Sequence, residues 1–134
     1  MEFTRKEIHA LERIARDADL EGVDVFDDFT DDEKLQSFNG TGGTNTPEWE
    51  RWLLTKLTGD KLAAVYIHDL QYRRGGTEED RLNTNRQLSR NFLKLHKYDS
   101  DHGRFSFSPW WNWASRKTIE ATDSDEAKGG WGVA

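Results

Sequence analysis

Three residues able to do acid–base or metal chemistry lie within five positions, at His68, Asp69 and Tyr72. On a helix, His68 and Tyr72 fall one turn apart on the same face, and Asp69 lies one position round. An imidazole can act as a general base near neutral pH, and a carboxylate can ligate a hard cation. The preceding segment LAAVYI is apolar nearly all round, which predicts a buried helix. The alternative interpretation is a core histidine bonded to a backbone carbonyl, with Asp69 capping a nearby segment.

A fourth polar residue, Asn85, interrupts the apolar face of the following helix. With Leu82 at 0°, that face spans an arc from about 220° to 20°, and Asn85 falls near 300°. The apolar members of the arc are Leu88, Phe92, Leu93 and Leu95. Two helices joined by the turn RRGGT should pack antiparallel, so we expect Asn85 to lie within hydrogen-bonding reach of His68. The alternative is an asparagine that bonds backbone and fixes the helix register.

The elements that must position these residues are predicted to be helices. Capping residues, apolar stripes and glycine stops indicate helices over 4–21, 31–38, 47–58, 61–73 and 78–97. Thr4 with Glu7 and Thr30 with Glu33 form capping boxes, and Gly22 is the expected stop of the first helix. The predicted fold is therefore a small, mainly α domain with two antiparallel central helices and little or no β structure.

Three stretches organise the chain. Residues 1–37 hold an N-terminal helix and an acidic segment, 38–97 the helical core, and 98–134 an aromatic-rich C-terminal segment and tail. In the last stretch, Trp110, Trp111 and Trp113 suit three roles: closing the core, lying at a lipid interface, or binding a protein partner.

The central stretch resembles the phospholipase A2 family over about residues 38–95. The residues His68-Asp69-Leu70-Gln71-Tyr72 match the family's His-Asp-x-x-Tyr motif. Upstream, the segment GTGGTNTP at 40–47 resembles the glycine-rich calcium loop, and downstream the helix from Asp80 to Phe92 resembles the partner helix that faces the histidine. The chain is more similar to compact, cysteine-free microbial and viral members than to the disulfide-rich secreted enzymes.

The resemblance implies a role for each matching residue. His68 would be the general base that takes a proton from the water attacking a phospholipid ester, and Tyr72 would support it by hydrogen bonding. Asp69 would bind Ca²⁺ together with the backbone carbonyls of Phe38, Gly40 and Gly42. The ion would polarise the ester carbonyl at a phospholipid or membrane surface.

Two features depart from the family pattern. Asn85 stands where the family has the aspartate that orients the base, and an amide cannot neutralise an imidazolium. The predicted helix over 47–58 also lengthens the connection between the glycine loop and His68. Two further hypotheses therefore stand beside the enzyme. One is a catalytically weakened fold that serves as a structural or interaction protein, for example in a phage or virus particle. The other is a hydrolase with a different metal site that uses His96 or His102.

Composition narrows the classes of function. The chain has 134 residues, enough for one domain, and a net charge of −6, which argues against nucleic-acid binding because phosphate contacts need a basic surface. Cysteine is absent, which excludes disulfides and thiolate metal sites. No stretch approaches the ~20 apolar residues of a membrane span, and the N-terminus lacks a secretory signal pattern. These features predict a cytoplasmic or virion-associated protein.

Overall fold

Helices and the turns between them make up the computed structural model, which describes residues 3–38 and 61–101. The helical elements are α1 (Arg5–Asp17), the 3-10 helix η1 (Val23–Asp28), α2 (Asp31–Phe38), α4 (Leu62–Arg74) and α5 (Glu78–Asp101). The mainly α prediction is confirmed, and the described residues include no strand. The predicted helix over 47–58 and the segment beyond residue 101, with Trp110, Trp111 and Trp113, lie outside the described residues.

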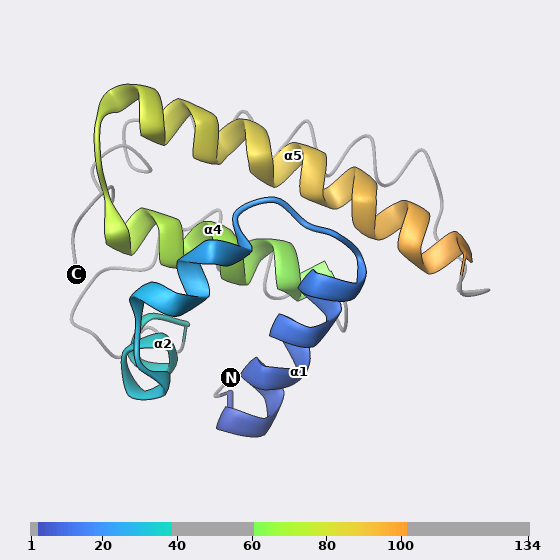
Figure 1. The fold of residues 1–134 in the computed structure, drawn as a ribbon, viewed down its shortest axis with the longest axis horizontal. Helices are drawn as coiled ribbons and strands as arrows, with labels where there is room; N and C mark the ends of the chain where they lie inside the picture. The colour runs from blue at the N-terminus through green and yellow to red at the C-terminus, as the bar shows by residue number, and fades with distance from the viewer. Residues whose placement is uncertain (1–2, 39–60, 102–134) are drawn as a thin grey trace.

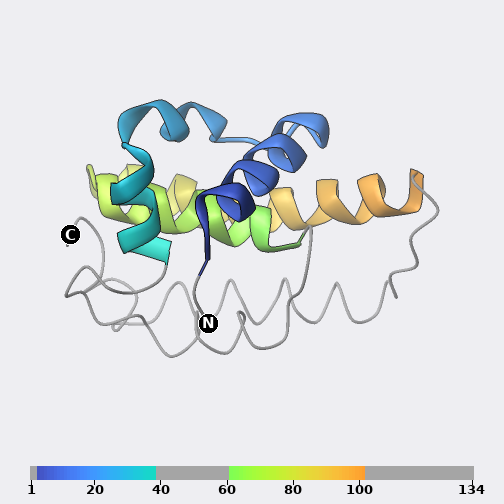
Figure 2. The ribbon, with the colours of Figure 1, turned by 90° about the horizontal axis from the view of Figure 1, so that it is seen from below.

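The helix α4 is the centre of this arrangement. It runs antiparallel to α5, as predicted, and α1, η1 and α2 pack against it (Figure 1). Seen from below, η1 and most of α1 lie to one side of the α4–α5 pair, and α2 crosses α4 (Figure 2). Ten of the thirteen residues of α4 are buried, which confirms the predicted apolar centre of the domain. Any polar side chain on α4 therefore has to find its partner inside the protein.

Three helices are capped at their N-termini by a threonine and an acidic residue that hydrogen-bond each other's backbone N–H groups. In each case the threonine hydroxyl accepts from the backbone N–H three residues on, while the acid accepts from the threonine N–H. The pairs are Thr4–Glu7, Thr30–Glu33 and Thr77–Asp80. The two predicted capping boxes are confirmed.

The first helix ends earlier than predicted, at Asp17 rather than near Gly22. Gly22 instead precedes η1 with φ +88°, a conformation that favours glycine. A β-carbon there would come within 2.5 Å of the Gln71 amide nitrogen on α4. The preceding residue, Glu21, is held by Asn91 of α5, whose side-chain amide pairs with the Glu21 backbone N–H at 2.8 Å and its carbonyl at 3.0 Å. The positive φ, together with the close approach of the Gln71 and Gln87 side chains, therefore favours glycine at this position.

The buried face of α5 differs from the predicted apolar arc. Leu88, Phe92 and Leu95 are buried, but Leu93 is 53% exposed, so its assignment to the core was wrong. The buried stripe instead includes polar residues at helical spacing: Arg81, Thr84, Asn85, Asn91 and Asp99. The helix also continues four residues past the predicted end, to Asp101, and its buried stripe extends to Asp99. None of the helices in the described part of the chain has the length and apolar composition needed to cross a membrane.

Candidate functional site

The candidate site is centred on His68 and Asn85, which meet between α4 and α5. The distance between His68 Nε2 and Asn85 Oδ1 is 3.0 Å, and the two residues are 2% and 5% exposed. The predicted contact between the two helices is thereby confirmed. The short connection of residues 75–77, which begins with Gly75, reverses the chain direction so that α4 and α5 are antiparallel. At 3.6 residues per turn, His68 and Asn85 then lie on the faces of the two helices that meet.

Tyr72 completes the contact from the next turn of α4. Its hydroxyl donates to Asn85 Oδ1 at 3.1 Å, the same oxygen that faces His68. Its ring lies against the His68 ring, with centroids 4.4 Å apart. The spacing of four residues between His68 and Tyr72 places both rings on one face of α4, as the sequence predicted. The amide of Asn85 therefore holds two aromatic side chains at once.

Burial holds the His68 ring in its neutral form. Loss of hydration lowers the pKa of His68 to about 4, although the hydrogen bond to Asn85 acts in the opposite direction. At neutral pH the ring consequently has one protonated and one unprotonated nitrogen. An unprotonated imidazole nitrogen can accept a proton, but a pKa this low makes it a weak base.

Arg81 belongs to the same site and was missed by the sequence analysis. Its side chain is 2% exposed, and its Nε and Nη2 donate to the Glu78 carboxylate at 3.0 and 2.6 Å. The Glu78 carboxylate, with a smaller contribution from Tyr72, raises the pKa of Arg81. The available signal was position: Arg81 lies one turn before Asn85, on the same face of α5. We call Arg81, Tyr72, Asn85 and His68 the His68 cluster.

Asp69 lies on a different side of α4, beside the end of α2. Ser37 donates its hydroxyl to Asp69 Oδ2 at 2.9 Å. The next residue, Phe38, is 5% exposed, and its ring packs against Phe3 and Tyr66. The Asp69 carboxylate thus lies beside the C-terminal end of α2, and its role as a calcium ligand stays a prediction. Gly40 and Gly42 lie outside the described residues.

A metal site built from several acidic or histidine side chains has no support among residues 3–38 and 61–101, where no group of three or more such side chains is suitably placed. His96 lies three turns beyond Asn85 along α5, about 16 Å at 1.5 Å per residue, so it does not join His68. His102 falls outside the described residues. Within the part of the chain that the structure describes, the hypothesis of a different His–Asp metal site is not supported.

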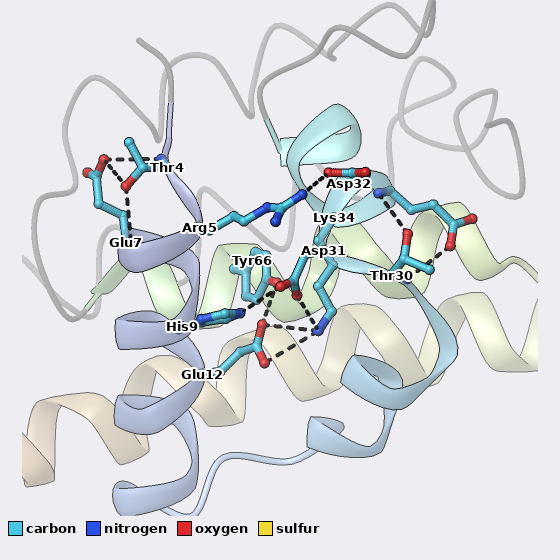
Figure 3. Close-up of polar contacts among 11 residues, drawn as sticks. Thr4, Arg5, Glu7, His9, Glu12, Thr30, Asp31, Asp32, Lys34 and Tyr66 are labelled. Carbon is cyan, nitrogen blue, oxygen red and sulfur yellow. Dashed lines mark hydrogen bonds and ion pairs between the residues drawn. The ribbon is translucent and has the colours of Figure 1, made fainter.

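A second buried polar cluster lies between α1, α2 and α4 (Figure 3). Tyr66 donates its hydroxyl to Glu12 Oε2 at 2.8 Å, and Lys34 Nζ lies 3.2 Å from the same oxygen. Lys34 is 6% exposed and Tyr66 is fully buried. Burial and the Glu12 carboxylate raise the pKa of Tyr66. We call Glu12, Lys34 and Tyr66 the Glu12 cluster; sequence reasoning did not single it out, because its members come from three separate elements.

Comparisons with known proteins leave the function to be argued from this geometry. The chain matches no protein-family model, and neither the curated proteins nor the solved structures contain a significant match to it.

Proposed function

We propose that the protein is a phospholipase A2-like hydrolase that cleaves a phospholipid ester in a Ca²⁺-dependent manner, with His68 as the general base. The observation that supports this most is the shared oxygen of Asn85, which accepts from both Tyr72 and His68 Nε2. This contact orients the imidazole so that its other nitrogen, Nδ1, can take a proton from a water molecule.

The remaining residues have defined parts in this proposal. Tyr72 holds the Asn85 amide and packs on the His68 ring, which restricts the ring to one orientation. Calcium would polarise the ester carbonyl. It would be bound by Asp69 and by the backbone carbonyls of Phe38, Gly40 and Gly42. Ser37 orients the Asp69 carboxylate from the end of α2.

A second candidate function is a structural or interaction protein that retains this fold with weakened catalysis, for example as a component of a phage or virus particle. Two observations favour it. His68 is only 2% exposed and has a pKa of about 4, and Asn85 cannot neutralise the imidazolium that forms during the reaction. In the serine protease triad, the corresponding Asp→Asn change lowers the rate about 10⁴-fold.

Restoring the missing carboxylate separates these two candidates. In a hydrolase, Asn85→Asp should raise the pKa of His68 through charge pairing and increase hydrolysis of phospholipid vesicles in millimolar Ca²⁺. Asn83→Asp is the matched control, because it adds the same charge at an exposed position of the same helix. His68→Ala should abolish hydrolysis, and Asp69→Ala should remove its dependence on Ca²⁺.

The same assay identifies the structural alternative. Wild type and Asn85→Asp would then both be inactive on the vesicles, and Ca²⁺ would not raise the melting temperature as ligand binding requires. Circular dichroism must show that Asn85→Asp is folded, because an unpaired buried carboxylate can cost several kcal/mol. A folded, inactive Asn85→Asp variant that ignores Ca²⁺ excludes the enzymatic proposal.

A further inference from the structure

Two neighbouring polar contacts join α1 to α2 (Figure 3). The outer contact pairs His9 with Asp31, and the distance between Nε2 and Oδ2 is 3.0 Å. The inner contact pairs Glu12 with Lys34, and the distance between Oε2 and Nζ is 3.2 Å. In each helix the two contributing residues are three positions apart, so they lie on one face. One face of α1 is therefore bound to one face of α2 at two successive points.

The charges of the inner contact are permanent, and they do not balance those around it. Lys34 Nζ also lies 3.9 Å from Asp31 Oδ1, so a single ammonium is shared between the carboxylates of Glu12 and Asp31. Tyr66 donates its hydroxyl to Glu12 but adds no charge. Arg5 and Asp32 balance one another in an ion pair of 2.6 Å. When His9 is neutral, these groups therefore carry one more negative than positive charge.

His9 is placed to supply the missing positive charge. Its side chain is 52% exposed, so solvent protons reach the ring. Histidine is the side chain whose charge changes between pH 5 and 8. The hydrogen bond from His9 lowers the pKa of Asp31, so the carboxylate remains ionised over that range. Among the described residues, the titratable and charged groups around this contact are Arg5 and Glu12 of α1, Asp31, Asp32 and Lys34 of α2, and Tyr66 of α4.

We propose that the His9–Asp31 contact is a pH-sensitive junction, which binds α1 to α2 more strongly when His9 is protonated. Protonation adds a positive charge to the ring that donates to the Asp31 carboxylate, and it balances the charges shared with Lys34. The contribution of this contact to stability consequently grows as the pH falls from 8 toward 5. Burial of His68 acts in the opposite direction, because it favours the neutral ring. The proposal is independent of the proposed function, since it uses no residue of the His68 cluster.

A double-mutant cycle at two pH values tests the proposal. The cycle comprises wild-type full chain, His9→Gln, Asp31→Asn and the double variant, and urea denaturation gives the unfolding equilibrium constant of each. Effects of other titrating groups, including His68, are common to the four proteins and cancel in the coupling between positions 9 and 31. We expect this coupling to increase by about two- to fivefold in the equilibrium constant between pH 8 and pH 5.5, as for a partly exposed ion pair.

Two matched variants separate the titration of His9 from a general effect of pH. The cycle of Arg5→Gln with Asp32→Asn joins the same two helices through an arginine whose charge does not change, so its coupling should be equal at both pH values. His9→Arg keeps a cation at position 9, and its coupling to Asp31 should likewise be independent of pH.

Three results would overturn the proposal. The first is a coupling between His9 and Asp31 that is the same at pH 8 and pH 5.5, or weaker at pH 5.5. The second is an equal rise in the Arg5–Asp32 cycle, which would show that acid strengthens this face without His9. The third is a coupling of His9→Arg to Asp31 that rises as much as that of wild type. Circular dichroism checks that each variant is folded, and the exposed positions of His9 and Arg5 favour this.

Discussion

The two buried polar clusters lie on nearly opposite faces of α4 and are built on different principles. Tyr66 and Tyr72 each donate a hydroxyl proton, but Tyr66 donates to the carboxylate of Glu12 and Tyr72 to the amide of Asn85. In the Glu12 cluster an ammonium compensates the carboxylate (Figure 3). In the His68 cluster the imidazole contacts two neutral side chains of the described residues, Asn85 and Tyr72, and the Arg81 guanidinium pairs with Glu78.

This difference indicates what each cluster can do. A buried ion pair holds elements together, since neither charge can be removed without stranding the other. A neutral imidazole in an amide contact retains a lone pair, which is the requirement for accepting a proton. The Glu12 cluster therefore joins α1 and α2 to α4, and the His68 cluster holds the neutral imidazole that the proposed function requires.

Removing the ammonium of the Glu12 cluster should have the largest effect on stability. Lys34→Met leaves the Glu12 carboxylate beside a buried tyrosine without its cation, and we expect the free energy of unfolding to fall by about 3 kcal/mol. Urea denaturation followed by circular dichroism measures this. Arg5→Met is the matched control, because Arg5 and Asp32 form an ion pair that is 61% and 77% exposed. That variant should unfold like wild type; equal losses in the two variants would contradict the assignment.

Acidification should have the second-largest effect on stability, and it should act through His68. The pKa of His68 is about 4 in the folded protein and about 6.5 in an unfolded chain. Between these values the unfolded state binds a proton that the folded state does not, so stability is complete above pH 6.5 and falls as the pH falls toward 4. The difference between the two pKa values corresponds to about 3 kcal/mol.

The measurement is urea denaturation at several pH values, for wild type and for His68→Gln. Carboxylates whose pKa is lowered in the folded state, such as those of Asp80 and Glu33, also lose their contribution to stability in acid. The effect of His68 is therefore given by the difference in the free energy of unfolding between wild type and His68→Gln. We expect that difference to shrink as the pH falls from 6.5 to 4. A difference that stays constant over this range would show that the His68 ring is not held neutral by burial.

Removing the Tyr72 hydroxyl should have the smallest effect. Tyr72→Phe retains the ring that packs on His68 and deletes one neutral hydrogen bond to Asn85, so we expect a loss of about 1 kcal/mol in the free energy of unfolding. Tyr66→Phe should be more damaging, because the Glu12 carboxylate then loses its donor. Calorimetry on the two variants compares them directly, and the reverse order would break the contrast between the clusters.

Local signals in the sequence account for the elements and for part of the site. Capping threonines with an acid three residues on are satisfied within one turn, so Thr4 and Thr30 could be assigned without any tertiary information. The contact between His68 and Asn85 was also predictable, because two helices and a short glycine turn leave few ways to pack. The roles of Asp69, Phe38, Gly40 and Gly42 in binding Ca²⁺ stay predictions.

Tertiary structure alone decided which polar residues were buried and which apolar ones were not. Arg81 and Lys34 look like surface residues in the sequence, yet both are nearly inaccessible, while Leu93 lies in the solvent. Arg81 pairs with Glu78 of its own helix and is buried because α4 packs against α5, whereas Lys34 pairs with Glu12 of another element, α1. Hydrophobic periodicity is a property of one segment, so it can be determined from the sequence of that segment alone. Burial depends on neighbours distant in the chain, whose positions exist only once the helices have packed.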